Sequence, residues 1–418
     1  MNLISRSVLA LCVLLAGCTV PAPVAQPSTG AAAAPPGKSA AAAPTAPVAA
    51  PAPIAVQPFD DAILSAANTL FSKAPLPAQP EPYPMVIDPL IDGMTGEQSK
   101  ASRAMGDRIA RLVRERYPNL SVRPFTRESI NQSPLILIGT LTPINREGKT
   151  EGVREIYRIC LALADLKTGK LISKGMTRSD PAGVDTTPTA FFRDSPAWAK
   201  ERTTDGYVKT CQGSKPGDPM DPIYLDRILI GTIIGEGIDA YNLGRYQDAL
   251  ARYTEAQRLP GGAGELRVLN GLYLTNYKLN HISAATELFG QIVDYGLQNQ
   301  RLAMKLLFKP GTTAFWPDPV VSGPYEMWLQ RIALRTEAAS ACLEVSGHTS
   351  PTGPSAINDR LSQLRAETIR SRLVAIAPAL DRRVIAVGVG SRENLIGTGR
   401  DDASDALDRR AGFKVISC

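Results

Sequence analysis

The sequence predicts an α+β protein of several domains. Three patterns support this prediction. Strand and helix periodicities alternate along residues 83–222, helical spacing with small and aromatic residues fills 223–300, and strands and helices alternate again along 301–418. About 360 residues follow the N-terminal low-complexity segment, more than one hydrophobic core usually serves, so two or three domains are expected.

The first eighteen residues have the pattern of an export signal. Arg6 precedes the apolar run Val8 to Leu15, which is shorter than the roughly 20 apolar residues that a membrane-spanning helix needs. The sequence Leu15-Ala16-Gly17-Cys18 resembles the bacterial lipobox, and the resemblance implies that Cys18 carries a diacylglycerol and becomes the mature N-terminus. Acyl chains contribute about 0.8 kcal/mol per buried methylene, enough to anchor a protein to a membrane.

The residue after the lipidated cysteine indicates in which membrane the protein is anchored. Thr19 is not the aspartate that commonly retains lipoproteins in the inner membrane, so the resemblance implies anchoring to outer-membrane lipid through Cys18, facing the periplasm. An ordinary secretory signal cleaved nearby is the alternative. Residues 19–57 consist almost wholly of Ala, Pro, Gly, Ser and Val, which indicates a tether, or an inert linker, rather than a folded element.

The charge balance and the cysteines indicate which partners, compartment and bound groups to expect. The 46 basic and 40 acidic residues are interleaved, so nucleic acid is not an expected partner. Apart from Cys12 and Cys18, four cysteines remain, which fits an oxidising compartment and two disulfides with three alternative pairings. Pairing within domains predicts bridges between the following cysteines: Cys160 and Cys211, and Cys342 and Cys418. Their wide spacing, with only His281 and His348 as histidines, gives no reason to expect a metal site or a cofactor.

Residues 83–222 read as an α/β domain. Strands are expected over 85–91, 120–125 and 134–141, a helix over 97–117, and a hairpin over 156–172 that turns at Asp165 to Lys170. This order, with its Asp-x-x-Thr-Gly turn, is similar to the periplasmic domain of the curli-export lipoprotein and of lipoprotein activators of peptidoglycan synthases. A generic α/β sandwich is the alternative. Residues 181–222 are expected to form an irregular, disulfide-pinned connection rather than a binding loop.

Residues 223–300 predict two helical hairpins. Small and aromatic residues alternate in the first hairpin at Gly237, Tyr241, Ala249 and Tyr253, and a more divergent copy starts near Gly271. This pattern resembles tetratricopeptide repeats, which implies a possible envelope protein partner, although a purely structural bridge is the alternative. Two such repeats bury too little surface to be stable alone, so they are expected to pack on a neighbouring domain.

Residues 301–418 carry the most specific motif. Gly347-His348-Thr349-Ser350 ends a strand, Asn358 to Ala366 opens a helix, and Gly388-Val389-Gly390 ends a later strand, before Leu407 to Val415. This order and spacing resembles the OmpA-like domain, a βαβαββ-type fold that associates with peptidoglycan in its family.

The resemblance implies a ligand site for the diaminopimelate of the peptidoglycan stem peptide. Arg365 falls on the family's arginine, and Asn358 and Thr352 fall on positions that line the pocket. A guanidinium binds a carboxylate in a fork-like geometry. Ser350 replaces the aspartate that pairs the ligand ammonium, a loss of about 1.5–3 kcal/mol. The alternatives are that Arg365 is a helix-surface residue, that His348 caps the turn, and that Arg409 and Arg410 bind loop carbonyls.

These patterns favour a binding and structural role in the cell envelope. An accessory or assembly factor of an envelope protein-secretion apparatus is the alternative. No catalytic motif is visible in the sequence, and the carboxylates of Asp88, Asp92 and Asp165 are assigned to turns and caps, so we expect no enzyme.

Overall fold

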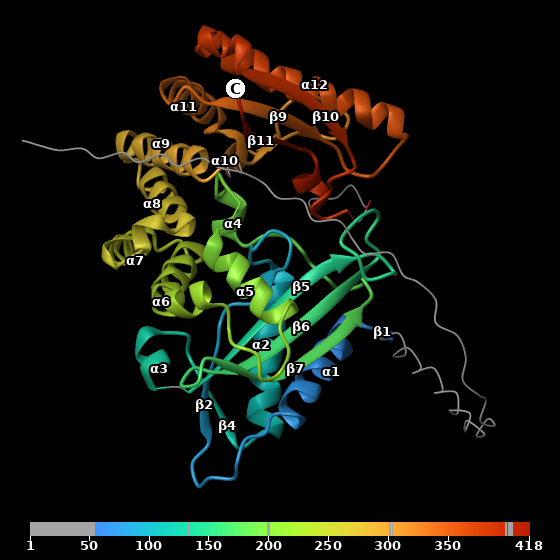
Figure 1. Cartoon of the computed structure of the whole chain (residues 1–418), viewed down its shortest axis with the longest axis vertical. Helices are drawn as coiled ribbons and strands as arrows, with labels where there is room; N and C mark the ends of the chain where they lie inside the picture. The colour runs from blue at the N-terminus through green and yellow to red at the C-terminus, as the bar shows by residue number, and fades with distance from the viewer. Residues whose placement is uncertain are drawn as a thin grey trace, which may run out of the picture. The chain divides into compact units, whose positions relative to one another are not determined.

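The computed structural model describes residues 55–132, 134–198, 201–300, 302, 304–397, 399 and 404–418. The predicted export signal, Cys18 and the predicted tether up to residue 54 lie outside the described residues. Residues Pro53–Cys418 form one compact unit, in which two sheets and the helices between them can be followed in Figure 1. In the part of the chain that the structure describes, no helix is long and apolar enough to cross a membrane.

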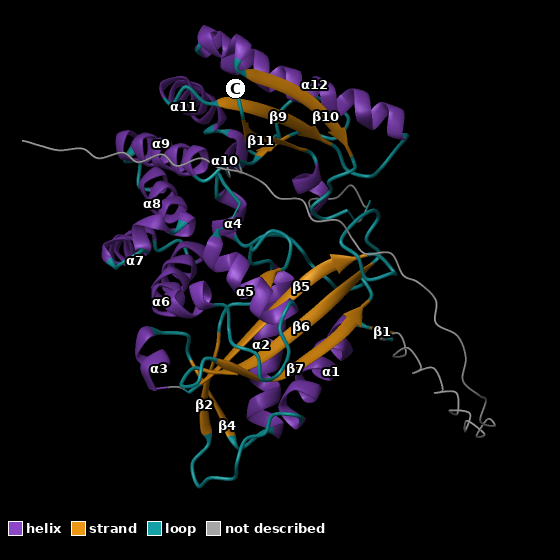
Figure 2. Cartoon of the chain, in the orientation of Figure 1, coloured by secondary structure: helices purple, strands orange, loops and turns teal. Residues whose placement is uncertain are grey.

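The first sheet is mixed, with order β1-β7-β6-β5-β2-β4, and β3 also pairs with β5 (Figure 2). Its strands are β1 Val56–Gln57, β2 Tyr83–Ile87, β3 Ile91–Asp92, β4 Leu120–Arg123, β5 Leu135–Ile144, β6 Ile156–Asp165 and β7 Lys170–Ser179. The hairpin of β6 and β7 is antiparallel, as predicted. The strand expected over 85–91 is instead two strands, β2 and β3, because Pro89 between them has no N–H for a ladder.

Both faces of this sheet are covered by helices. Helices α1 Phe59–Ser72 and α2 Lys100–Arg116 pack on the face that carries Leu135 and Leu137. Residues of α5 Arg202–Gln212 pack with Ile136 and Ile138 on the other face. Because successive side chains of a strand point to opposite faces and both faces are covered, β5 is buried along its whole length.

The folded body begins earlier than the sequence predicted. The predicted tether extends to residue 57 and the predicted first domain starts at 83, but β1 pairs in parallel with β7 and α1 lies on the sheet. The backbone of Ala66 in α1 passes so close to Gly175 that a Cβ there would lie 2.0 Å from the Ala66 carbonyl oxygen. The alanines of α1 are therefore packing residues, although their composition resembles that of the preceding tether.

The connection over 181–222 is partly helical rather than irregular. It contains α4 Ala190–Asp194 and α5, and α5 forms because Tyr207 and Cys211 lie one turn apart and are both buried. Both predicted disulfides are present: Cys160–Cys211 links β6 to α5, and Cys342–Cys418 closes the last domain. The connection is therefore pinned by a disulfide, as expected, but through a helix.

Two helical hairpins follow, as predicted. Their helices are α6 Pro222–Asn242, α7 Tyr246–Arg258, α8 Leu266–Lys278 and α9 Ile282–Gln298. The ring of Tyr253 on α7 lies against both Gly237 on α6 and Gly271 on α8. The small residues thus let the aromatic ring enter between the helices. The assignment of these hairpins to the tetratricopeptide repeats stays a prediction.

The last domain contains a smaller sheet with order β10-β9-β11-β8. Its described strands and α-helices are β8 Leu306–Leu307, α10 Pro319–Ser322, α11 Tyr325–Ala338, β9 Cys342–His348, α12 Ser355–Ile376, β10 Val384–Gly390 and β11 Arg410–Ile416. Strand β10 runs parallel to β9, and β11 is antiparallel to both β9 and β8. Helix α3 Arg127–Gln132, which precedes β5 in the first domain, was not predicted.

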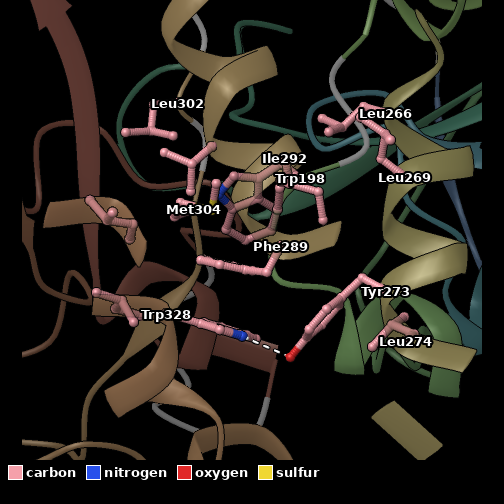
Figure 3. Close-up of a cluster of buried hydrophobic side chains, with 14 of the residues drawn as sticks. Trp198, Leu266, Leu269, Tyr273, Leu274, Phe289, Ile292, Leu302, Met304 and Trp328 are labelled. Carbon is pink, nitrogen blue, oxygen red and sulfur yellow. Dashed lines mark hydrogen bonds between the residues drawn. The ribbon is translucent and has the colours of Figure 1, made fainter. Parts of the chain in front are cut away.

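The hairpins and the last domain share one hydrophobic core. The rings of Phe289 on α9 and Trp328 on α11 stack with centroids 5.4 Å apart, and the Trp328 Nε1–H donates to the hydroxyl of Tyr273 on α8 at 2.8 Å (Figure 3). The expected packing of the hairpins on a neighbouring domain is therefore confirmed.

Two glycine substitutions should have opposite effects on stability. In Gly271→Ala the new Cβ would lie 2.4 Å from the Tyr253 ring, and overpacking of this kind lowers the free energy of unfolding by about 1–3 kcal/mol. In Gly231→Ala, on α6, the new Cβ meets nothing within 4 Å. The higher helix propensity of alanine should therefore raise the free energy of unfolding by up to about 1 kcal/mol. Urea unfolding of the two variants measures this difference, and changes of the same sign would contradict it.

Candidate functional site

The predicted ligand-site residues gather at the turn between β9 and α12. The hydroxyl oxygens of Ser350 and Thr352 lie 3.0 Å apart, and the Asn358 Nδ2–H donates to the Thr352 carbonyl oxygen at 3.0 Å. Ser350 and Asn358 are buried. Three of the four predicted residues therefore belong to one hydrogen-bonded turn.

Arg365, the fourth residue, is fully buried under the same turn. Its guanidinium donates to the carbonyl oxygens of Thr312 at 2.9 Å, Lys309 at 2.9 Å and His348 at 2.7 Å. It also lies over the ring of Phe308, 5.1 Å from its centroid. The alternative of an ordinary helix-surface arginine is thereby wrong. In this structure the guanidinium holds the segment after β8 against the end of β9.

The imidazole of His348 points to the other face of the sheet. Its Nε2 lies 3.0 Å from the Ser346 hydroxyl. The sequence interpretation that the His348 ring caps the turn is therefore wrong. Burial and the neighbouring Arg410 guanidinium hold the pKa of His348 well below its usual value. A neutral ring follows from this at physiological pH.

The segment 394–397 lies beside the turn and is held by Asp408. The carboxylate of Asp408 accepts the backbone N–H groups of Leu395, Ile396 and Gly397 at 2.6–2.9 Å. The Asn394 Nδ2–H donates to the Thr349 carbonyl oxygen at 2.8 Å, which connects this segment directly to the turn. Arg410 donates to the carbonyl oxygens of Leu407 and Glu393. It therefore binds loop carbonyls, as one of the sequence alternatives expected.

A residue of the first domain also holds this segment. Arg154, in the connection between β5 and β6, is buried and donates to the carbonyl oxygens of Asn394 and Leu395, both at 2.6 Å. Its backbone N–H donates to the Gly397 carbonyl oxygen. Arg154 was missed from the sequence because its partners lie about 240 positions away, and no local pattern points to them.

The three aspartates that the sequence assigned to turns and caps have different roles in the structure. Asp92 accepts the N–H groups of Met94 and Thr95, and Asp165 accepts that of Lys167, so both have turn roles as expected. Asp88 does not. Its carboxyl accepts the Tyr224 hydroxyl at 2.5 Å, and burial raises its pKa to about 7.

The raised pKa makes Asp88 destabilising at high pH. The folded protein keeps the proton up to a pKa of about 7, whereas the ordinary value is 3.8, so stability falls as the pH rises from about 4 to 7. Asp88→Asn cannot ionise and keeps an oxygen for the Tyr224 hydroxyl. We expect it to raise the free energy of unfolding at pH 8 by about 1–3 kcal/mol and to change it little at pH 4. Urea unfolding at both pH values measures this, and a gain independent of pH would contradict it.

Metal ligands do not cluster in the described residues: no group of three or more His, Cys, Asp or Glu side chains is placed to hold a metal ion.

Comparison with known proteins gives partial structural matches. No family model matches the sequence, and no curated protein matches it. The peptidoglycan-associated lipoprotein from Burkholderia pseudomallei matches at 25% identity over 27% of this chain and 89% of that chain, with a TM-score of 0.23. The cell wall anchor of the T6SS from Pseudomonas aeruginosa matches at 20% identity over 31% and 97% (TM-score 0.23), and the periplasmic domain of Helicobacter pylori MotB at 15% over 27% and 71% (TM-score 0.21).

Proposed function

We propose that this chain is an envelope lipoprotein whose last domain associates with peptidoglycan. The observation that supports this most directly is the arrangement of the four OmpA-like motif positions. Ser350, Thr352 and Asn358 form one turn, and the Arg365 guanidinium binds the His348 carbonyl oxygen at the start of that turn. The motif residues, separated in sequence, therefore meet at one place.

The charges at this turn suit one half of a zwitterionic ligand. Buried Arg365 supplies a fixed positive charge, which attracts a carboxylate such as that of diaminopimelate. The Thr352 hydroxyl, which lies 3.0 Å from that of Ser350, can donate a hydrogen bond to the same carboxylate. Ser350 has no charge to pair the ligand ammonium, so we propose weaker binding than a site with an aspartate there would have.

Restoring the missing acid should strengthen binding. In Ser350→Asp, the new carboxylate can pair with the ligand ammonium. Such a charge-assisted hydrogen bond contributes about 1.5–3 kcal/mol, or roughly 10- to 100-fold in affinity. Retention on purified sacculi at a series of protein concentrations measures this. Ser355→Asp is the matched control, because it adds the same charge at an exposed position at the start of α12. Equal retention of both variants and wild type would remove this turn from consideration.

Loss of the guanidinium gives the complementary test. Arg365→Ala should lower retention on sacculi, whereas Arg392→Ala, which removes an exposed cation paired with Asp359, should not. Because Arg365 also holds three carbonyl oxygens, the thermal midpoint of each variant is measured first, and retention is compared at a temperature where all are folded. Unchanged retention of folded Arg365→Ala would contradict the proposal.

Anchoring through Cys18 is part of the same proposal and rests on the lipobox resemblance. Cells that express the full chain should incorporate labelled palmitate into it and place it in the outer-membrane fraction. Cys18→Ser should lose both the label and the membrane association, because no acyl chain can be attached. Unlabelled, cytosolic wild-type protein would refute this part of the proposal.

The proposed role is binding rather than catalysis, because no catalytic motif is visible in the sequence. A second candidate is a protein partner, as in an accessory factor of a secretion apparatus. It is favoured by apolar side chains exposed at the hairpin ends, Leu243 at 69% and Ile282 at 48%. Cross-linking in whole cells distinguishes the two candidates, since this one requires a dominant protein partner.

A further inference from the structure

A pocket separate from the β9–α12 turn lies between the first sheet and the helices that follow it. It is lined by residues that follow β2 and by residues of α5, α6 and the start of α8. Its wall is half aromatic and aliphatic, and its polar groups include Asp88, Tyr224 and Arg267. Ligand pockets typically have this composition, an apolar wall with a few placed polar groups.

Asp88 offers an acceptor to this pocket. One carboxyl oxygen accepts the Tyr224 hydroxyl at 2.5 Å, and among the described residues the other oxygen has no hydrogen-bond partner. The neighbouring Tyr207 cannot supply a donor, because its hydroxyl already donates toward the carbonyl oxygens of Pro89 and Gly139. A half-buried carboxyl with one oxygen facing a pocket can accept a hydrogen bond from a donor on a ligand.

The cations around the pocket are already paired. Arg267 is half-buried and forms an ion pair with the buried Glu201, which also accepts the Arg267 backbone N–H at 3.1 Å. Arg227 donates to the Pro260 carbonyl oxygen and lies 3.6 Å from the Glu265 carboxylate. The Arg267 charge also acts on Asp88 and lowers its pKa, against the larger effect of burial, which raises it. In the described residues, however, neither arginine hydrogen-bonds to the Asp88 carboxyl, so an oxygen of that carboxyl remains available to a cationic group.

Aromatic rings line the pocket beside Asp88. The rings of Tyr207 and Tyr224 meet edge to face with centroids 5.2 Å apart, and Phe192 is a further part of the wall. Aromatic rings attract ammonium groups and repel carboxylates at their faces. The rings and the free carboxyl oxygen therefore select the same kind of ligand.

The space in the pocket depends on a glycine. Gly231 on α6 lines it, and a Cβ built there meets nothing within 4 Å. The cavity itself is small, about 50 Å³, which fits a short aliphatic group rather than a large ring system.

We propose that this pocket binds a primary ammonium group on a short alkyl stem, with Asp88 as its counter-ion and the rings of Tyr207 and Tyr224 around it. The site does not depend on the proposed peptidoglycan association. The ammonium can belong to a free amine or to a lysine side chain, because the recognised chemistry is the same.

Titration of the full chain with n-butylamine at pH 8, followed by calorimetry, tests the proposal. Saturable binding is expected, with at least a 10-fold weaker response to the isosteric n-butanol and to butyrate. Nα-acetyl-lysine amide distinguishes the lysine source, since it binds only if the mouth admits a peptide. Equal responses to butylamine, butanol and butyrate, or no response to any amine, would overturn the proposal.

Two pairs of variants complete the test. Asp88→Asn keeps the acceptor for Tyr224 but removes the charge, and it should weaken butylamine binding at least 10-fold, whereas Asp294→Asn, which removes a surface carboxylate paired with Arg335, should not. Gly231→Leu should fill the pocket and abolish binding, whereas Gly231→Ala should retain it. Butylamine binding that survives both Asp88→Asn and Gly231→Leu would show that the amine binds elsewhere and would overturn the proposal.

Discussion

The stacking of Phe289 against Trp328 is the contact on which the second half of the molecule depends. Two helical hairpins alone do not bury enough apolar surface to be stable, and this contact extends their core into the last domain. The first domain shares in this core through Phe191 and Trp198. It is also attached by polar contacts, the buried ion pair of Glu97 with Lys305 and the hydrogen bonds of Arg154. The segment beside the β9–α12 turn is therefore held by Arg154 of the first domain as well as by residues of the last domain.

Local patterns explain which elements could be predicted from the sequence. The β6–β7 hairpin and the four hairpin helices were predicted because alternation, turn residues and helical spacing are properties of short segments. Helix α1 was missed because its alanines resemble the tether before it, and they become packing residues only beside Gly175 of β7. Helix α5 was missed because most of its buried residues are Thr and Gly, which give no apolar helical pattern.

At the candidate site, the sequence predicted which residues belong to the site but not the contacts that their side chains make. The motif identified Arg365, Asn358, Thr352 and Ser350, and the structure brings them to one turn. The bonding of the Arg365 guanidinium could not be predicted, since two of its carbonyl partners come from residues 309 and 312, more than fifty positions earlier. Asp88 was misassigned for a similar reason, because its partner Tyr224 lies 136 positions away.

Strand β1 determines where tension on the chain first acts. A force on the N-terminal end loads only two residue pairs with β7 and next the helix α1, so these elements detach before the sheet itself. Further extension meets the Cys160–Cys211 bond, which prevents β6, β7 and α5 from being drawn out beyond the loop that it closes. The folded body can therefore lengthen at its N-terminal end, by the detachment of β1 and α1, while the β9–α12 turn keeps its shape.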